Sequence, residues 1–213
     1  MVAALSSTLP DYDERVSNGS ADEISDRILQ AALTCFQEVG VRRTSVDDIA
    51  RAAGVGRMTV FRRFENKERL AQQVLLQILA QTAESVQRAF VGAADLETGL
   101  TEAIFTSVRE LRDHPLFAKL MKTEPDTFLG AGRSGGVSAI ALMRHSITGW
   151  LGSSGGGPLS DQDAEMVAET TVRLGVSLIL APGGPIPLHD DDGMRAFIAR
   201  YLVPGIARLA TDS

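Results

Sequence analysis

Apolar residues recur at steps of three and four along most of this 213-residue chain, most clearly in residues 24–39, 70–86 and 194–209. This spacing places apolar side chains on one face of an α-helix. No segment shows a convincing alternation of apolar and polar residues, the period of a half-buried strand, and no internal repeat is present. The sequence therefore predicts an all-α fold.

Composition narrows the class of protein. Hydrophobic residues make up 44% of the chain and charged residues 23%, which is typical of a globular protein. The longest uncharged apolar stretch, residues 174–188, is interrupted by prolines and glycines, so we expect no membrane helix. The chain starts without the basic segment of a secretory signal, and its single cysteine, Cys35, lies on an apolar helix face. These features predict a cytoplasmic protein in which Cys35 is a core residue.

Residue patterns for catalysis or metal binding are weak. The three histidines and Cys35 have no paired spacing, so we expect no metal site. Two matches to G-x-S-x-G, at Ser134 and Ser154, lie in Gly- and Ser-rich stretches and follow no predicted strand, whereas a hydrolase nucleophile needs a strand-to-helix turn. We therefore predict flexible loops there, no cofactor and no enzymatic activity.

Three parts follow one another along the chain. Residues 1–19 have the composition of a disordered arm. Residues 20–70 predict three helices, the second opening with a capping box at Ser45 and the third, ending near Phe64, following a break at Gly54. The last two helices, within about 45–64, make a helix-turn-helix unit. Residues 71–213 predict a larger helical domain.

The basic charge of the chain is local. Residues 42–69 hold eight Lys and Arg against four Asp and Glu, a net charge of +4, whereas the whole chain has a net charge of −6. One basic segment suits a protein that presents a single face to a polyanion, although on charge alone a solvated helix surface fits as well. The third helix can bury Val60 and Phe64, which leaves Arg57, Met58, Thr59, Phe61 and Arg62 outward, on a face that fits a DNA major groove.

At this point residues 22–70 resemble the TetR/AcrR family of bacterial transcriptional regulators. The resemblance is carried by Phe36-Gln-Glu-Val-Gly40, Thr44-Ser-Val-Asp-Asp-Ile-Ala50, Ala53-Gly-Val55, Thr59-Val-Phe61, Phe64, Asn66-Lys-Glu68 and Leu70. The rest of the chain is similar in size and helical character only. The resemblance implies that the third helix is the recognition helix and that Ser45 and Lys67 anchor phosphates.

Residue chemistry and resemblance together predict a DNA-binding set, in which Arg57 and Arg62 either read a guanine edge or contact phosphate. The set is Arg43, Thr44, Ser45, Arg57, Met58, Thr59, Phe61, Arg62 and Lys67. Two positions depart from the family: Gly56 stands where a serine cap is common, and Phe61 replaces a tyrosine whose hydroxyl contacts phosphate.

The resemblance also implies that the last two long helices form a four-helix dimer interface. Residues 173–180 are apolar nearly all round, which supports this prediction, although an ordinary buried core helix fits too. Residues 191–209 predict one amphipathic helix with a kink at Pro204. The predicted interface comprises Thr170, Arg173, Leu174, Ser177, Leu178, Phe197 and Tyr201.

Between the helix-turn-helix and these helices, aromatic and methionine residues recur at helical spacing. They predict either plain core or an apolar pocket for a mainly hydrophobic ligand, with Arg144 or His145 as a polar anchor. The pocket set is Phe105, Phe117, Met121, Phe128, Met143, Arg144, Trp150 and Met166.

The sequence thus predicts a homodimeric, ligand-responsive repressor. It binds a palindromic double-stranded DNA operator through the helix around Arg57–Phe64 and is released by a small hydrophobic effector. An α-helical small-molecule sensor or interaction protein without operator binding is the alternative, because Gly56 and Phe61 remove two family contacts to phosphate.

Overall fold

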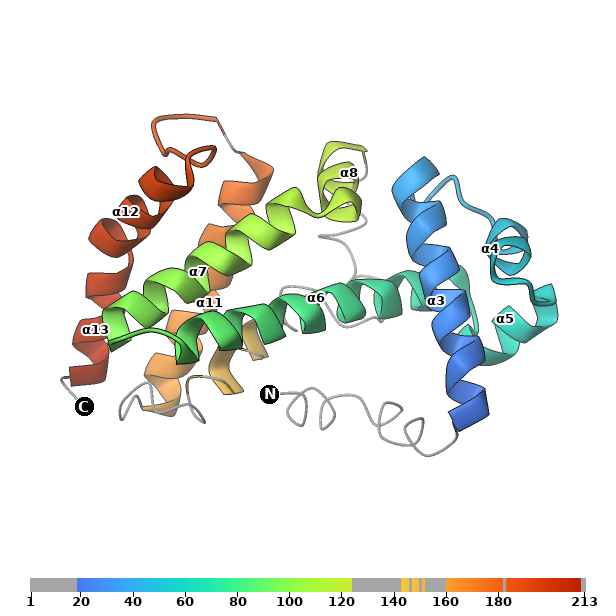
Figure 1. The fold of residues 1–213 in the computed structure, drawn as a ribbon, viewed down its shortest axis with the longest axis horizontal. Helices are drawn as coiled ribbons and strands as arrows, with labels where there is room; N and C mark the ends of the chain where they lie inside the picture. Colours follow the sequence, from blue (N-terminus) through green and yellow to red (C-terminus); the bar gives the residue numbers. More distant parts are fainter. Residues whose placement is uncertain are drawn as a thin grey trace. The chain divides into compact units, whose positions relative to one another are not determined.

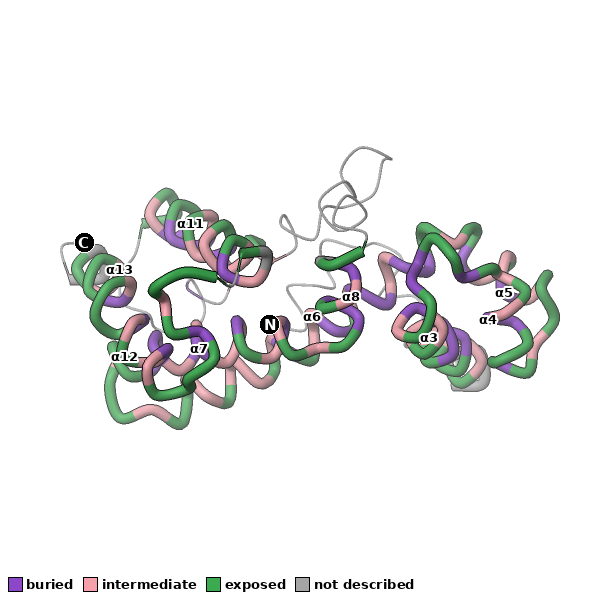
Figure 2. Tube along the Cα trace, turned by 90° about the horizontal axis from the view of Figure 1, so that it is seen from above, coloured by how far each residue is buried: buried purple, intermediate pink, exposed green. Residues whose placement is uncertain are grey.

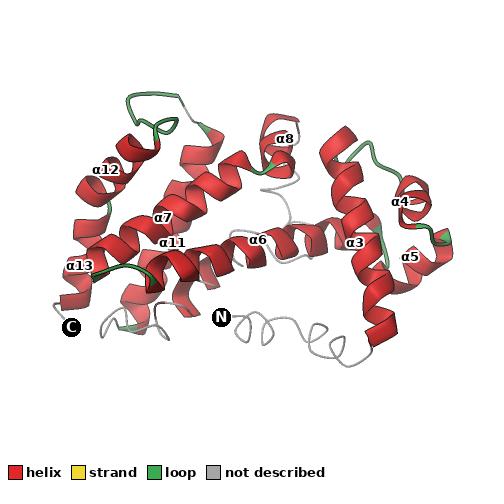
Figure 3. Cartoon of the chain, viewed as in Figure 1, coloured by secondary structure: helices red, strands yellow, loops and turns green. Residues whose placement is uncertain are grey.

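The structure is a computed structural model that describes residues 19–123, 143–145, 147–149, 151, 160–181 and 183–211. Every regular element within these ranges is a helix (Figure 3), which confirms the predicted all-α fold. The described residues divide into two compact units, one of residues 19–79 and 114–123, the other of residues 80–113 and 143–211. The functional boundary placed after residue 70 stays a prediction.

We call the first the helix-turn-helix unit. It holds the first part of α6 and four further helices (Figure 1). The bounds are α3 (Gly19–Val39), α4 (Val46–Ala53), α5 (Arg57–Phe64), α6 (Lys67–Val91) and α8 (Pro115–Thr123). The helix α4 contacts both α3 and α5, and α8 contacts α3.

Local capping defines the helix limits in this unit. The Ser45 hydroxyl accepts the Asp48 N–H at 3.1 Å while the Asp48 carboxylate accepts the Ser45 N–H at 3.2 Å, the reciprocal pattern of a capping box. Gly54 ends α4 with φ 64°, a left-handed conformation that costs glycine no steric strain. Asn66 accepts the Arg69 N–H at 2.8 Å and so caps α6. The predicted start of α4 is confirmed.

The core of the helix-turn-helix unit draws one apolar face from each helix. Val60 and Phe64, the two buried residues of α5, are 2% and 4% exposed. Cys35 on α3 is only half-buried, and burial raises the pKa of its thiol. The other large buried side chains are Ile28, Phe36, Ile49, Leu70, Val74, Leu116, Phe117 and Leu120.

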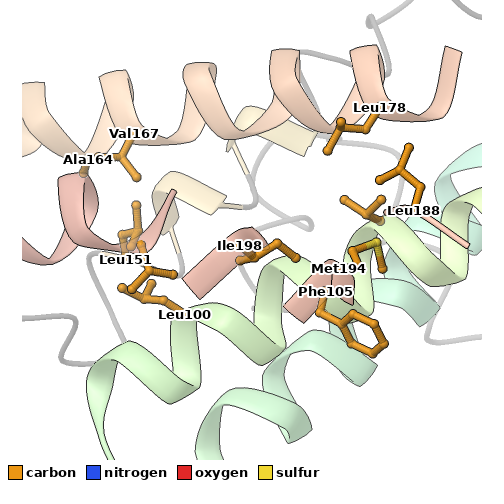
Figure 4. Close-up of a cluster of buried hydrophobic side chains, with 11 residues drawn as sticks. Leu100, Phe105, Leu151, Ala164, Val167, Leu178, Leu188, Met194 and Ile198 are labelled. Carbon is orange, nitrogen blue, oxygen red and sulfur yellow. The ribbon is translucent and has the colours of Figure 1, made fainter. Parts of the chain in front are cut away.

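The second compact unit is built around α7 (Leu96–Asp113), which contacts α11 (Asp161–Leu180), α12 (Asp191–Tyr201) and α13 (Val203–Thr211). Its buried side chains converge from α7, α11, α12 and the segment before α12 (Figure 4). Leu151 lies between Val167 on α11 and Leu100 on α7 in this cluster. Ser160 accepts the Asp163 N–H at 3.1 Å and caps α11.

The predicted single helix over residues 191–209 is wrong in one respect. The chain does not kink at Pro204 within one helix; α12 ends at Tyr201, and α13 starts at Val203 after a break at Leu202. Proline disfavours helical backbone at the residue before it and has no N–H to donate to the Arg200 carbonyl. The interruption therefore falls ahead of the proline.

Candidate nucleic-acid interface

The helix α5 separates a buried face from an exposed one, as the burial colours of Figure 2 show. Met58 is 77% exposed, and Arg57 and Arg62 are also exposed. Thr59 and Phe61 are half-buried, so these two reach solvent less than predicted. The face available to DNA thus consists mainly of two arginines and a methionine.

Arg57, the first residue of α5, has two neighbours. Its Nη1 donates to Asp47 Oδ2 on α4 at 2.9 Å, and its guanidinium carbon lies 5.3 Å from the centre of the Phe61 ring. The side chains of Arg57 and Asp47 remain 57% and 52% exposed. The pair is therefore accessible to a ligand as large as DNA.

The start of α5 carries no side-chain cap. Gly56 occupies the N-cap position with extended backbone, φ −74° and ψ 146°, and makes no side-chain hydrogen bond. The first N–H groups of a helix attract anions because they lack partners within the helix. The absence of a capping oxygen leaves this end of α5 to be satisfied by solvent or phosphate.

The turn between α4 and α5 is fastened to α3 by Arg27. Its Nη2 donates to the carbonyls of Ala53 at 3.0 Å and Gly54 at 3.4 Å. A cation at a helix C-terminus satisfies unpaired carbonyls and complements the helix dipole. The sequence analysis did not identify Arg27 or Asp47. Each charge complements a helix end: Arg27 lies at the C-terminus of α4, and Asp47 lies in the first turn of α4.

Thr44 is corrected from a phosphate donor to an internal residue. It is 1% exposed, its hydroxyl donates to the Gly40 carbonyl at 2.7 Å, and its N–H donates to the same carbonyl at 3.2 Å. Gly40 has φ 92°, and this left-handed turn bends the chain and directs Thr44 inward. Both donors of Thr44 are consumed within the protein.

The other predicted phosphate anchors lie on the surface, but two of them have protein partners. Lys67 is half-buried, and its ammonium donates to the carbonyls of Arg42 and Thr44, each at 3.1 Å. The exposed Ser45 hydroxyl donates to Asp48 at 2.5 Å, and hydrogen bonds from Ser45 lower the pKa of that carboxyl. Arg43 is exposed on the turn before α4.

The described members of the predicted pocket set are divided between the two compact units. Phe105 is buried in the second unit with the Arg195 guanidinium 3.6 Å from its ring centre, whereas Phe117 is buried in the helix-turn-helix unit. Helical periodicity identified both faces correctly but could not tell which unit each helix joins. Phe128, Trp150 and the Met121 side chain lie outside the described residues.

Arg144 and Met143 lie in the second unit, where Met143 is half-buried. The Arg144 guanidinium pairs with Glu169 on α11 at 3.4 Å, and Glu169 also accepts from Arg173 at 2.5 Å. Both arginines lower the pKa of the Glu169 carboxyl, Arg173 more strongly. Arg144 therefore serves an ion-pair network rather than standing alone as a polar anchor.

An apolar groove of about 300 Å³ lies between α7, α11 and the α12–α13 pair. Met166 and Tyr201, at its margins, are 59% and 65% exposed. Leu178 is only 6% exposed and belongs to the core, which corrects its prediction as an interface side chain. The groove is lined by Ile104, Val108, Met166, Val167, Thr170, Thr171, Leu174, Gly175, Leu178, Tyr201, Leu202, Gly205 and Ile206.

Of the remaining predicted interface residues, Thr170, Leu174 and Tyr201 line this groove. Arg173 and Ser177 are exposed on α11. Phe197 is half-buried, and its ring centre lies 5.4 Å from that of Tyr201. Within the described ranges no helix is long and apolar enough to cross a membrane, and no three potential metal ligands gather.

A capped α4, a left-handed turn and a short α5 with basic residues on its open face define a helix-turn-helix DNA-binding domain, the domain of a transcriptional regulator. Residues 28–74 match the family model described as bacterial regulatory proteins, tetR family. The matched residues form a TetR-type DNA-binding domain, and the chain is similar to HTH-type transcriptional regulators over 84% of its length.

Two solved structures and one sequence relative illustrate the relationship. An uncharacterized HTH-type transcriptional regulator of Mycobacterium tuberculosis, Rv1255c, is 29% identical over 182 residues, covering 84% of each chain. The TetR family repressor AlkX from Dietzia sp. strain DQ12-45-1b, implicated in biodegradation of n-alkanes, is 22% identical, with a TM-score of 0.64 over 85% of this chain and 94% of its own. RolR in complex with resorcinol is 14% identical, with a TM-score of 0.56 over 92% and 96%. These two structures share the fold.

Proposed function

We propose that this chain is a dimeric repressor that binds an inverted-repeat DNA operator through α5 and is released by a mainly hydrophobic small molecule. The observation that carries the proposal is the division of α5 into a buried face, Val60 and Phe64, and an open face with Arg57, Met58 and Arg62. A helix held this way can enter the major groove without losing its packing. We place its action in the cytoplasm, with its DNA partner.

Phosphate contacts around α5 would set the register of the helix on the duplex. Arg43 and Arg62 are exposed cations on the same compact unit, and the N-terminus of α5 presents backbone N–H groups. Lys67 and Ser45 contribute at the surface while keeping their internal hydrogen bonds. Each cation that neutralises a phosphate releases counterions, so binding should weaken steeply with salt.

A dimer is supported by the groove on the second unit. Its exposed margin combines Met166, Thr170 and Tyr201, and exposed apolar side chains gathered on one surface are typical of a protein interface. A two-fold dimer would place two recognition helices about 34 Å apart, on successive major-groove turns. The operator should therefore be an inverted repeat.

The effector is proposed to be small and mainly hydrophobic. AlkX, with the same fold, is implicated in n-alkane biodegradation, and RolR was solved with resorcinol. In this chain the apolar cluster around Leu151 adjoins the segment with Met143, so we keep Phe128, Met143 and Trp150 as candidate lining residues. Release requires that the ligand bind more tightly to a dimer with one separation of its two helix-turn-helix units than to a dimer with another separation.

The test begins with selection of binding sites from random double-stranded DNA by the purified protein, followed by titration of the selected duplex and a scrambled duplex at several salt concentrations. We expect an inverted repeat and a weakening of specific binding with salt. Arg62→Ala should weaken operator binding by about 1–3 kcal/mol if the arginine contacts a base, and should weaken both duplexes equally if it contacts phosphate. Selection of no sequence would refute operator binding.

The dimer is tested separately by sedimentation of the wild type and of Met166→Glu. A charge introduced at an interface that excludes water is costly, so the variant should sediment as a monomer over a range in which the wild type is a dimer. Glu165→Gln, at the exposed neighbouring position, is the control for altered surface charge. A monomeric wild type at micromolar concentration would contradict the dimer.

A sensor without operator binding is the second candidate. It is favoured by Gly56, which provides no capping side chain, and by Phe61, which has no hydroxyl for a phosphate. The selection experiment separates the two, because a sensor alone would bind all duplexes weakly and equally.

A further inference from the structure

Arg57 and Arg62 are both exposed on α5, but their surroundings differ. Arg57 pairs with Asp47 at 2.9 Å and lies over the Phe61 ring, whereas Arg62 has no ion-pair partner among the described residues. An exposed ion pair adds little to folding stability, because water screens it and ordering two side chains costs entropy. The Asp47–Arg57 pair therefore needs an explanation other than stability.

Position along the helix is the first part of that explanation. In helix-turn-helix proteins the N-terminal residues of the recognition helix contact base edges, and Arg57 is the first residue of α5. Only Nη1 of its guanidinium donates to Asp47, so further N–H donors remain for a ligand. Paired donors of arginine match the O6 and N7 acceptors of guanine.

Charge is the second part. A phosphate oxygen that approached the Arg57 guanidinium would also approach the Asp47 carboxylate and be repelled. Guanine O6 and N7 carry only partial charges, so the carboxylate opposes their approach far less. Asp47 consequently makes Arg57 selective for a neutral acceptor pair over an anion.

Preorganisation is the third part. A free arginine loses several rotamers when it binds in one geometry, and this entropy is subtracted from affinity. The carboxylate of Asp47 and the face of Phe61 already restrict the guanidinium before DNA arrives. Arg62, without such partners, suits a phosphate, which tolerates many approach directions.

We propose that Asp47 is a specificity-determining positioning residue, which holds Arg57 for contact with a guanine edge and disfavours its contact with phosphate. This inference rests on the proposed operator binding. Arg57 is the base-reading residue and Asp47 acts through it without touching the base. Recognition of one guanine in each operator half-site therefore depends on both residues.

The experiment repeats the binding-site selection with wild type, Arg57→Ala, Arg57→Lys and Asp47→Asn. The binding constants of each are then measured by fluorescence anisotropy on the selected operator and on a scrambled duplex over a series of salt concentrations. The control is Asp191→Asn. Asp191 is also a first-turn aspartate, 48% exposed, paired with Arg109 at 3.4 Å, but it lies in the second compact unit.

We expect Asp47→Asn to lower the ratio of operator to scrambled affinity by about tenfold, the discrimination carried by one bidentate base contact. Preference should relax at one guanine per half-site, the same one that Arg57→Ala and Arg57→Lys relax. On scrambled DNA the variant should bind more tightly and with a steeper salt dependence, because the released arginine contacts phosphate. Asp191→Asn should leave the ratio unchanged.

Three results would overturn the inference. If Asp47→Asn bound both duplexes more tightly by the same factor, Asp47 would only repel DNA. If it bound both more weakly by the same factor and had a lower melting temperature, Asp47 would only support the fold. Retention of the guanine preference in Arg57→Ala, which removes every side-chain donor at this position, would remove the arginine from base reading. If the wild type selects no operator, the proposed function itself fails, an outcome distinct from the other three.

Discussion

Replacement of Gly56 by serine tests whether the open N-terminus of α5 limits both stability and DNA affinity. The backbone at this position is already that of an N-cap, with φ −74° and ψ 146°. The nearest atom to a Cβ added at this position would be Thr59 Oγ1 at 3.9 Å, an ordinary contact. Gly56→Ser can therefore be accommodated without strain. Its hydroxyl can accept an N–H from the first turn of α5.

The magnitude follows from capping energetics. A serine at the N-cap stabilises a helix by a few tenths of a kcal/mol more than glycine does. Alanine, which adds a Cβ without an acceptor, stabilises the helix less than glycine does. Gly56→Ser and Gly56→Ala should therefore differ by about 1 kcal/mol in unfolding free energy, about 2–4 °C in melting temperature for a chain of this length. Thermal unfolding followed by circular dichroism measures the difference.

The same hydroxyl should contact phosphate. One added hydrogen bond contributes about 1 kcal/mol, so Gly56→Ser should tighten binding by about fivefold on operator and scrambled DNA alike. The salt dependence should not change, because a neutral donor displaces no counterion. Weaker binding by Gly56→Ser than by Gly56→Ala, with both folded, would refute the reasoning that this end of α5 meets DNA.

Three further predictions follow from single residues. Phe61→Tyr should tighten binding to all duplexes by a similar small factor, measured by anisotropy, because the family resemblance implies a phosphate-contacting tyrosine hydroxyl at this position; a change confined to the operator would contradict this. Thr44→Val should lower the unfolding free energy by about 1 kcal/mol through loss of the hydrogen bond to Gly40, yet leave DNA affinity unchanged, because the hydroxyl is buried. Burial lowers the pKa of His114, whose Nδ1 accepts the Leu116 N–H. As the pH falls, the unfolded chain therefore takes up this proton before the folded chain does. The free energy of unfolding should then fall as the pH drops from about 6.5 towards 5. His114→Asn keeps an acceptor that does not titrate there, so its melting temperature should fall less over that window; an identical fall would assign the effect to other groups.

Much of the fold could be predicted because helix limits depend on neighbours in sequence. Ser45 with Asp48, Asn66 with the Arg69 N–H and Ser160 with Asp163 are all contacts three residues apart, so residue identities alone can indicate them. The turn at Gly54 could likewise be predicted from the residue type, because glycine adopts a positive φ without strain.

Contacts distant in sequence escaped prediction. Thr44 reads as an open donor before a helix, but the turn at Gly40 directs it inward. The pairing of Asp47 with Arg57 and the contact of Arg27 with the Ala53 carbonyl depend on how the helices cross, which periodicity does not specify. For the same reason the sequence could not assign Phe105 and Phe117 to different units.

Because the buried side chains that anchor α5 are Val60 and Phe64, its exposed positions can be exchanged with little effect on folding. Libraries randomised at Met58 and Arg62 should retain a large fraction of folded members, which makes this scaffold suitable for retargeting to new DNA sequences. Drift at these positions would let related regulators diverge in the genes they control while their architecture is retained.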